Sequence, residues 1–127
     1  MRARRASAVL CALALAGCGG GTTGTDAGGG GVDVGVGTDE GARLVAGGSA
    51  ATGDGLQHGH FFRPTILDGV KAMDRVAQEE IFGPVLSVIR VRGYEEAAMA
   101  VNATRYGLSS SIFTRDTNTA FRAMRDF

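Results

Sequence analysis

The uneven distribution of glycine constrains the fold of this chain more than any other feature. Fourteen of the 21 glycines lie before Ala51 in a chain of 127 residues. From residue 19 to residue 37 the sequence is almost entirely Gly, Thr, Asp and Val. Ordering such a stretch costs backbone entropy and buries no long apolar side chain in return. We therefore expect residues 19–40 to form a Gly-rich flexible linker and residues 41–127 to contain the folded part.

The N-terminus begins with charged residues that precede an apolar run. Three arginines within the first five residues are followed by apolar residues 6–16, a run too short to span a bilayer. The run ends in Leu-Ala-Gly-Cys at residues 15–18, which resembles the lipobox of bacterial lipoproteins. Residues 1–18 are thus predicted to be a lipoprotein-like signal segment, with Cys18 as the lipidation site and membrane anchor. The alternatives are a chance product of a GC-rich reading frame and a short buried helix at residues 6–16.

Composition and cysteine placement exclude several classes of site. The 13 basic and 13 acidic residues balance, so no nucleic-acid partner is expected. Both cysteines lie in the first 18 residues, which leaves none for a disulfide framework or a zinc site in the folded part. His58 and His60 have no third ligand near them in sequence, and we predict no metal site. The G-x-G-x-x-G pattern at residues 19–24 lacks the strand and the helix that a dinucleotide fingerprint needs.

The pattern of apolar residues after residue 40 predicts an α/β fold. Leu44–Ala46 and Phe61–Leu67 are predicted to be extended, with Pro64 at a sheet edge or in an excursion beside it. Residues 85–91 are apolar at nearly every position, which indicates a parallel strand that needs partners on both sides.

The remainder of the chain completes a predicted parallel strand-helix-strand-helix unit. An amphipathic helix is expected to begin at Tyr94 and to end at Gly107 as its C-terminal cap. Ser110–Thr114 would be the next strand, reached by a parallel crossover. A closing helix would follow, capped by Asp116 or Thr117.

The segment at residues 78–85, Gln-Glu-Glu-Ile-Phe-Gly-Pro-Val, carries a family resemblance. It is similar to the E-E-I-F-G-P-V signature of the NAD(P)-dependent aldehyde dehydrogenase superfamily. Further landmarks in the same order are Gly41–Leu44, Phe62–Thr65, Asn102 with Tyr106–Ser109, and Phe113–Asp116. The resemblance covers about two-thirds of the chain. It implies a partial aldehyde dehydrogenase catalytic domain from a homo-oligomeric family that oxidises an aldehyde or semialdehyde to a carboxylic acid with NAD or NADP.

The same resemblance assigns cofactor-binding roles to two residues. Glu80 would accept hydrogen bonds from the hydroxyls of the nicotinamide ribose, and a carboxylate offers acceptors for both. Phe82 would lie against the nicotinamide ring and exclude water. Without the motif, the favoured interpretation would be that Glu79 and Glu80 are surface carboxylates and Phe82 is a core residue.

The residues that perform the family's chemistry have no counterparts here. The cysteine nucleophile, the oxyanion-hole donor, the glutamate base and the dinucleotide-binding domain cannot be placed on this sequence. We therefore expect no catalytic residue and no bound cofactor in this chain by itself, which would be an internal fragment inactive alone. The alternative is a membrane-anchored lipoprotein whose domain serves binding or structure. The location would be the membrane if the signal is real, and the cytoplasm otherwise.

Overall fold

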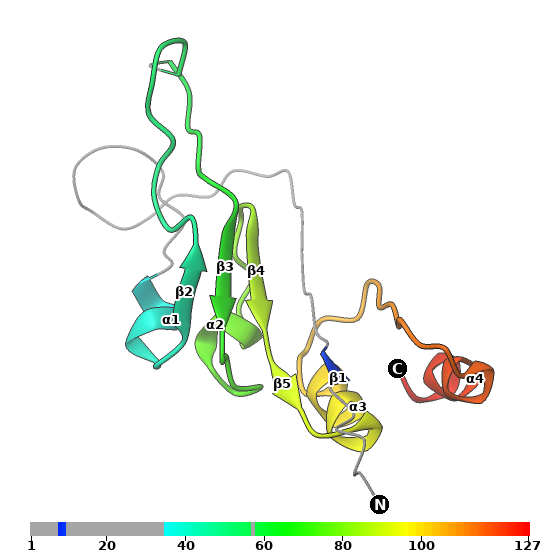
Figure 1. Cartoon of the computed structure of the whole chain (residues 1–127). Helices are drawn as coiled ribbons and strands as arrows, with labels where there is room; N and C mark the ends of the chain where they lie inside the picture. The colour runs from blue at the N-terminus through cyan, green and yellow to red at the C-terminus, as the bar shows by residue number, and fades with distance from the viewer. Residues whose placement is uncertain (1–7, 10–34, 57) are drawn as a thin grey trace, which may run out of the picture.

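The computed structural model describes residues 8–9, 35–56 and 58–127. A small sheet carries two short helices on one of its sides (Figure 1). A long excursion extends above the sheet, and two longer helices lie below it. The elements are β1 (Ala8–Val9), α1 (Gly35–Asp39), β2 (Arg43–Ala46), β3 (Thr65–Asp68), α2 (Arg75–Gln78), β4 (Val85–Val88), β5 (Arg90–Val91), α3 (Tyr94–Asn102) and α4 (Thr117–Asp126).

The main sheet has the strand order β2-β3-β4. β2 runs antiparallel to β3, while β3 and β4 are parallel, with Leu67 opposite Ser87. The predicted α/β class and the parallel pairing of the apolar strand are thus confirmed. Residues 85–91 were predicted to be one strand, but they form two, β4 and β5. β5 pairs with β1 in antiparallel orientation.

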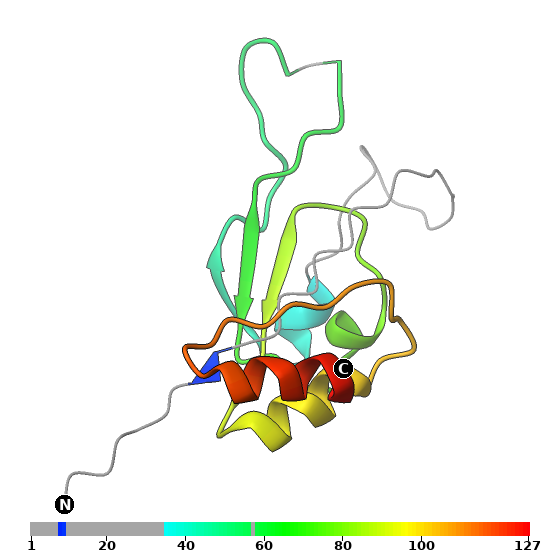
Figure 2. The same cartoon turned by 90° about the vertical axis from the view of Figure 1, so that its right-hand side faces the viewer.

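Leu67 lies at the centre of the core and is fully buried. It comes from β3, the middle strand, and the core cluster around it is completed by Ala42, Val70, Val76, Ala77 and Val85. α1 and α2 cover one face of the sheet (Figures 1 and 2). Burial of these aliphatic side chains, at about 25 cal/mol per Å² of apolar surface, is the main force that holds the sheet and the two helices together.

Residues 35–39 form α1, although the flexible linker was expected to continue to residue 40. Gly37 of this helix is buried, and a Cβ there would come 2.8 Å from Leu67 Cδ1. The absence of a side chain at Gly37 therefore lets α1 approach the core closely. The carboxylate of Glu40, just after the helix, accepts a hydrogen bond from the Arg75 backbone N–H at 2.9 Å and so ties α1 to α2.

A long excursion separates β2 from β3 and carries Pro64 at its end (Figure 1). Its two arms are joined by an isolated bridge between Ala50 and Phe62. The predicted extended run at residues 61–67 is therefore split: its first half lies in the excursion, and β3 begins only at Thr65. Thr65 anchors the junction, because its buried hydroxyl donates to the Arg63 carbonyl and accepts from the Gly48 N–H, both at 2.8 Å.

Contacts of the Tyr94 side chain hold the two longer helices, α3 and α4, together. Its hydroxyl donates to Asp126 Oδ2 at 3.0 Å, its ring stacks against Phe127, and the guanidinium of Arg122 lies 4.3 Å from the ring centroid. Asp116 caps α4 as predicted, by accepting from the Thr119 N–H at 2.9 Å.

Two predictions for the segment between these helices are wrong. α3 ends at Asn102 with Ala103 as its cap, so Gly107 is not the C-cap. The Asn102 side chain itself satisfies carbonyl oxygens there, donating to Ala98 O at 3.1 Å and to Asp126 O at 2.7 Å. Ser110–Thr114 forms no strand, and the parallel crossover joins β3 to β4 through α2 instead. An extended segment becomes a strand only when its backbone is paired, and no described strand pairs with this one.

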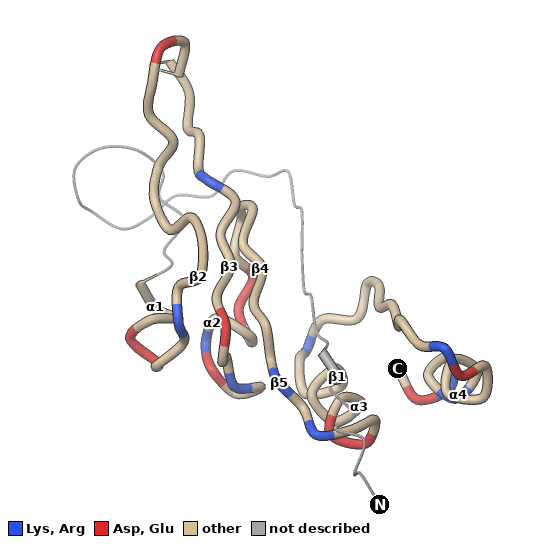
Figure 3. The backbone as a smooth tube through the Cα atoms, viewed as in Figure 1, with Lys and Arg blue, Asp and Glu red and all other residues tan. Residues whose placement is uncertain are grey.

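Charged residues are mixed in sign over the described part of the chain (Figure 3). Asp68 lies nearly buried at the end of β3 and binds two arginines, Arg43 on β2 and Arg90 on β5, with an N–O distance of 2.8 Å in each ion pair. Hydrogen bonds from Arg90 and then from Arg43 hold the pKa of this carboxyl far below its usual range. The three charges therefore tie β2, β3 and β5 together.

Candidate functional site

The candidate site is built on the loop at residues 79–84, which joins α2 to β4. The loop leaves α2 through Glu79, whose backbone is already extended. Gly83 has a φ of 156°, a conformation that residues with a side chain rarely adopt. Pro84 then fixes the loop to the sheet, because its carbonyl accepts a hydrogen bond from the Thr65 N–H at 2.8 Å. The loop is therefore held at both ends by regular structure.

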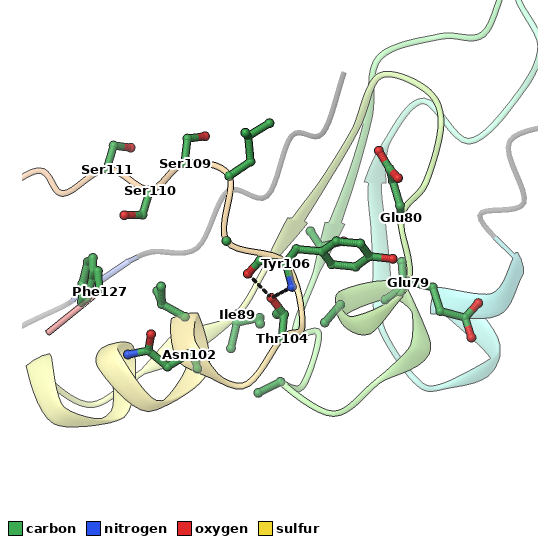
Figure 4. A pocket seen from close by; sticks show the side chains of 18 of the residues that line it. Glu79, Glu80, Ile89, Asn102, Thr104, Tyr106, Ser109, Ser110, Ser111 and Phe127 are labelled. Carbon is green, nitrogen blue, oxygen red and sulfur yellow. Dashed lines mark hydrogen bonds between the residues drawn. The ribbon is translucent and has the colours of Figure 1, made fainter. Parts of the chain in front are cut away.

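The two glutamates of this loop differ in their surroundings. Glu79 is bound to Arg75, with hydrogen bonds of 3.1 and 2.9 Å to its two carboxylate oxygens. The hydrogen bond from Arg75 is the largest cause of the lowered pKa of Glu79. Glu80 is half-buried, and its carboxylate has no hydrogen-bond or ion-pair partner among the described residues. The two side chains point in different directions from the loop (Figure 4). Of these two carboxylates, only that of Glu80 has no partner among the described residues.

A cavity of about 420 Å³ lies beside this loop, and both Glu79 and Glu80 line it. One wall comes from β4 and the residue after it, through Val85, Ser87 and Ile89, and another from α2. The opposite wall is the segment after α3, where Tyr106 extends toward the loop of Glu80 (Figure 4). A turn fixes Tyr106, since its N–H donates to Thr104 Oγ1 at 3.2 Å. Sequence reasoning missed Ser87 as a cavity residue, although it is a polar side chain in the middle of the otherwise apolar residues 85–89.

Phe82 lies outside the walls of this cavity and is half-exposed, at 52% of its surface. An aromatic ring left this open to solvent loses apolar burial and is available to stack against a planar ligand. The structure therefore brings Glu80 and the segment of Tyr106 to one cavity and places Phe82 on the same loop, outside it.

The other residues singled out from the sequence lie apart from this cavity. His58 and His60 are exposed in the excursion. Cys18 and the G-x-G-x-x-G pattern fall outside the described residues. Among the residues that the structure describes, no group of three His, Cys, Asp or Glu side chains could hold a metal ion. No helix in the described part of the chain has the length and apolar character to cross a membrane.

Comparison with known proteins assigns the family. Residues 34–127 match the model of the aldehyde dehydrogenase family, so the chain belongs to that family. Fluoroacetaldehyde dehydrogenase of Streptantibioticus cattleyicolor is 47% identical over 91 residues, which are 71% of this chain and 18% of that protein. A probable aldehyde dehydrogenase of Mycobacterium tuberculosis is 45% identical over 92 residues, 72% of this chain and 18% of its own length.

Solved structures of the family agree with the computed fold. The Mycobacterium tuberculosis aldehyde dehydrogenase complexed with NAD+ superposes with a TM-score of 0.66 at 39% identity, over 72% of this chain and 19% of that one. Indole-3-acetaldehyde dehydrogenase complexed with NAD+ gives a TM-score of 0.66 at 45% identity, over 72% and 18%. This chain thus spans about 18% of the length of the curated relatives it matches.

Proposed function

We propose that this chain supplies the nicotinamide-ribose contacts of an aldehyde dehydrogenase catalytic domain, in a protein that oxidises an aldehyde or semialdehyde to a carboxylic acid with NAD(P). The observation that carries the proposal is the state of the two loop glutamates. Both glutamates line the cavity, but the carboxylate of Glu79 is hydrogen-bonded to Arg75, whereas that of Glu80 is half-buried and has no partner among the described residues. The residue that the family motif selects for the ribose is also the one that this fold leaves available.

The residues present fit the cofactor's nicotinamide end. The carboxylate of Glu80 accepts hydrogen bonds from two neighbouring hydroxyls, and bonds to a charged acceptor are stronger than neutral ones. The half-exposed ring of Phe82 offers an apolar surface for a flat heterocycle and excludes water from it. NAD(P), when bound, is the hydride acceptor of the reaction. Glu80 and Phe82 bind and orient, and we assign neither of them a chemical step.

A chimera tests this assignment. Residues 43–127 replace the matching segment of indole-3-acetaldehyde dehydrogenase, which is 45% identical. We expect the chimera to form NADH from its aldehyde. Glu80→Gln should raise the KM for NAD by roughly tenfold or more, because a hydrogen bond to a charged group contributes about 1.5–3 kcal/mol. Glu79→Gln is the matched control and should leave the KM nearly unchanged. Equal effects of the two substitutions would refute the assignment.

We also propose that Cys18 is lipidated and anchors the chain to a membrane. The proposal rests on the order of arginines, apolar run and lipobox-like tetrapeptide at the N-terminus. Each buried methylene of an acyl chain contributes about 0.8 kcal/mol, so more than one chain gives stable anchoring. Expression in a bacterium should give a membrane-bound product with an acylated Cys18, and Cys18→Ser should move the protein to the soluble fraction. Mass spectrometry that finds an unmodified chain beginning at Met1 would reject the proposal that Cys18 is lipidated.

A further inference from the structure

Two arginines bind the same carboxylate at the end of the sheet that lies opposite Pro84. Oδ2 of Asp68 accepts a hydrogen bond from Nη2 of Arg43 and another from Nη2 of Arg90, both at 2.8 Å. The two nitrogen atoms are therefore no further apart than twice 2.8 Å. Nε of Arg90 donates to the second oxygen, Oδ1, at 3.0 Å. Two guanidinium groups are thus held together by one carboxylate, which leaves a net charge of one positive unit.

The carboxylate of this cluster is buried, whereas the two cations face solvent. The Asp68 side chain is 11% exposed, but those of Arg43 and Arg90 are 71% and 69% exposed. Nη1 of both arginines and Nε of Arg43 make no hydrogen bond to a described residue. No second carboxylate in the described part of the chain pairs with either guanidinium. Because the whole chain has a formal net charge of zero, the excess positive charge is a local property of this cluster.

The cluster lies where ligands commonly bind on sheets of this class. β3 and β4 are parallel, and Asp68 and Val88, their last residues, lie side by side. Arg43 is the first residue of the antiparallel β2 and pairs with Asp68, so it lies at the same end, and Arg90 follows β4 at once. In Figure 3 the blue segments of β2 and β5 flank the red end of β3. Open α/β sheets bind ligands outside the carboxyl ends of their parallel strands.

The unused donors of the two arginines fit a phosphate group. A guanidinium presents its N–H donors in a planar fork that matches phosphate oxygens, and hydrogen bonds between charged groups are about twice as strong as neutral ones. A tetrahedral phosphate carries acceptor oxygens on several sides, so one phosphate group can accept from both arginines at once. We propose that Arg43 and Arg90 together bind a phosphate group, either inorganic phosphate or a phosphomonoester. The inference does not depend on the role proposed for Glu80.

A phosphate titration of the whole isotope-labelled chain, followed by NMR of the arginine Nε–Hε groups, tests the site. In about 0.1 M NaCl, exposed charges more than about 10 Å apart are largely screened. The signals of Arg43 and Arg90 should shift and saturate with a Kd of roughly 1–10 mM, since exposed charge pairs each contribute little. Arg92 is the internal control, because it is 94% exposed and already paired with Glu96, and its signal should not move with the other two.

Substitutions measure the contribution of each arginine. Arg43→Gln and Arg90→Gln should each raise the Kd for inorganic phosphate by about tenfold, because each removes hydrogen bonds to a charged group. Arg92→Gln removes the same charge close by and should leave the Kd within about twofold. Equal weakening by all three substitutions would show diffuse attraction and overturn the proposal. Where a variant unfolds, the unsubstituted chain decides: no saturable shift at Arg43 and Arg90, or equal shifts of all three signals, would also overturn it.

Two further ligands define the chemistry of the site. Phenyl phosphate is the phosphomonoester: a lower Kd than that of inorganic phosphate would identify the site as one for phosphomonoesters, and a higher Kd as one for the free ion. Acetate carries a single charge on two oxygens and should bind about tenfold more weakly than inorganic phosphate. Acetate that binds as tightly as phosphate would overturn the choice of ligand.

Discussion

Leu67→Ala should remove a large part of the stability of this fold. Leu67 is fully buried in the middle strand, and its Cδ1 lies beside Gly37 of α1. Truncation of a buried leucine to alanine costs about 2–5 kcal/mol, because the transfer free energy is lost and a cavity remains. A folded stretch of this size has a free energy of unfolding of roughly 5–14 kcal/mol. The substitution therefore removes between about a seventh and all of this free energy.

Urea unfolding followed by far-UV circular dichroism measures this loss. With an m-value of about 1 kcal/mol per M, the midpoint should fall by about 2 M or more. Met73→Ala is the matched control, because Met73 is similar in size and 75% exposed, and its effect should stay within about 0.5 kcal/mol. Equal shifts for the two variants would show that Leu67 is not the centre of the core and would refute the packing described here.

Two further predictions concern charge and backbone. Asp68 has a pKa held below its usual range in the folded state, so its stabilising contribution is present above the unfolded pKa of about 3.9 and is lost as the pH falls further. Asp68→Asn should therefore lower the urea midpoint at pH 7, by a difference that narrows below about pH 4; a difference independent of pH would contradict this. Gly47 and Gly69 both have positive φ, 75° and 78°, and alanine at either costs about 1–2 kcal/mol in backbone strain. Gly47→Ala should cost more, because its Cβ would meet the Pro64 carbonyl while Gly69 faces open space; thermal unfolding that ranks them the other way would count against the excursion as described.

Apolar periodicity predicted the fold well where burial decides the structure. The apolar run after Pro84 indicated a parallel strand, and the spacing after Gly93 predicted α3, because both signals report which side chains face the core. Asp116 was predicted as a cap from local chemistry alone, since a carboxylate there accepts from the backbone of the next turn.

The predictions that were wrong depend on contacts that local sequence does not encode. Gly37 was predicted to belong to a linker, but the absence of its side chain lets α1 pack against Leu67, thirty residues later in the chain. Gly107 looked like a cap, but Asn102 satisfies the helix end by reaching α4. For the site, the motif identified Glu80, whereas the difference between Glu79 and Glu80 arises from the position of Arg75 and is visible only in three dimensions.

A crystal structure of the chimera described above with NAD+ bound would show which side chain of this chain holds the nicotinamide ribose. We expect both hydroxyls of the nicotinamide ribose to lie within hydrogen-bond distance of the Glu80 carboxylate, at about 2.5–3.0 Å. We also expect the ring of Phe82 to lie against the nicotinamide. A ribose held by Glu79, or by no residue of this loop, would refute the assignment of Glu80 as the ribose-binding residue.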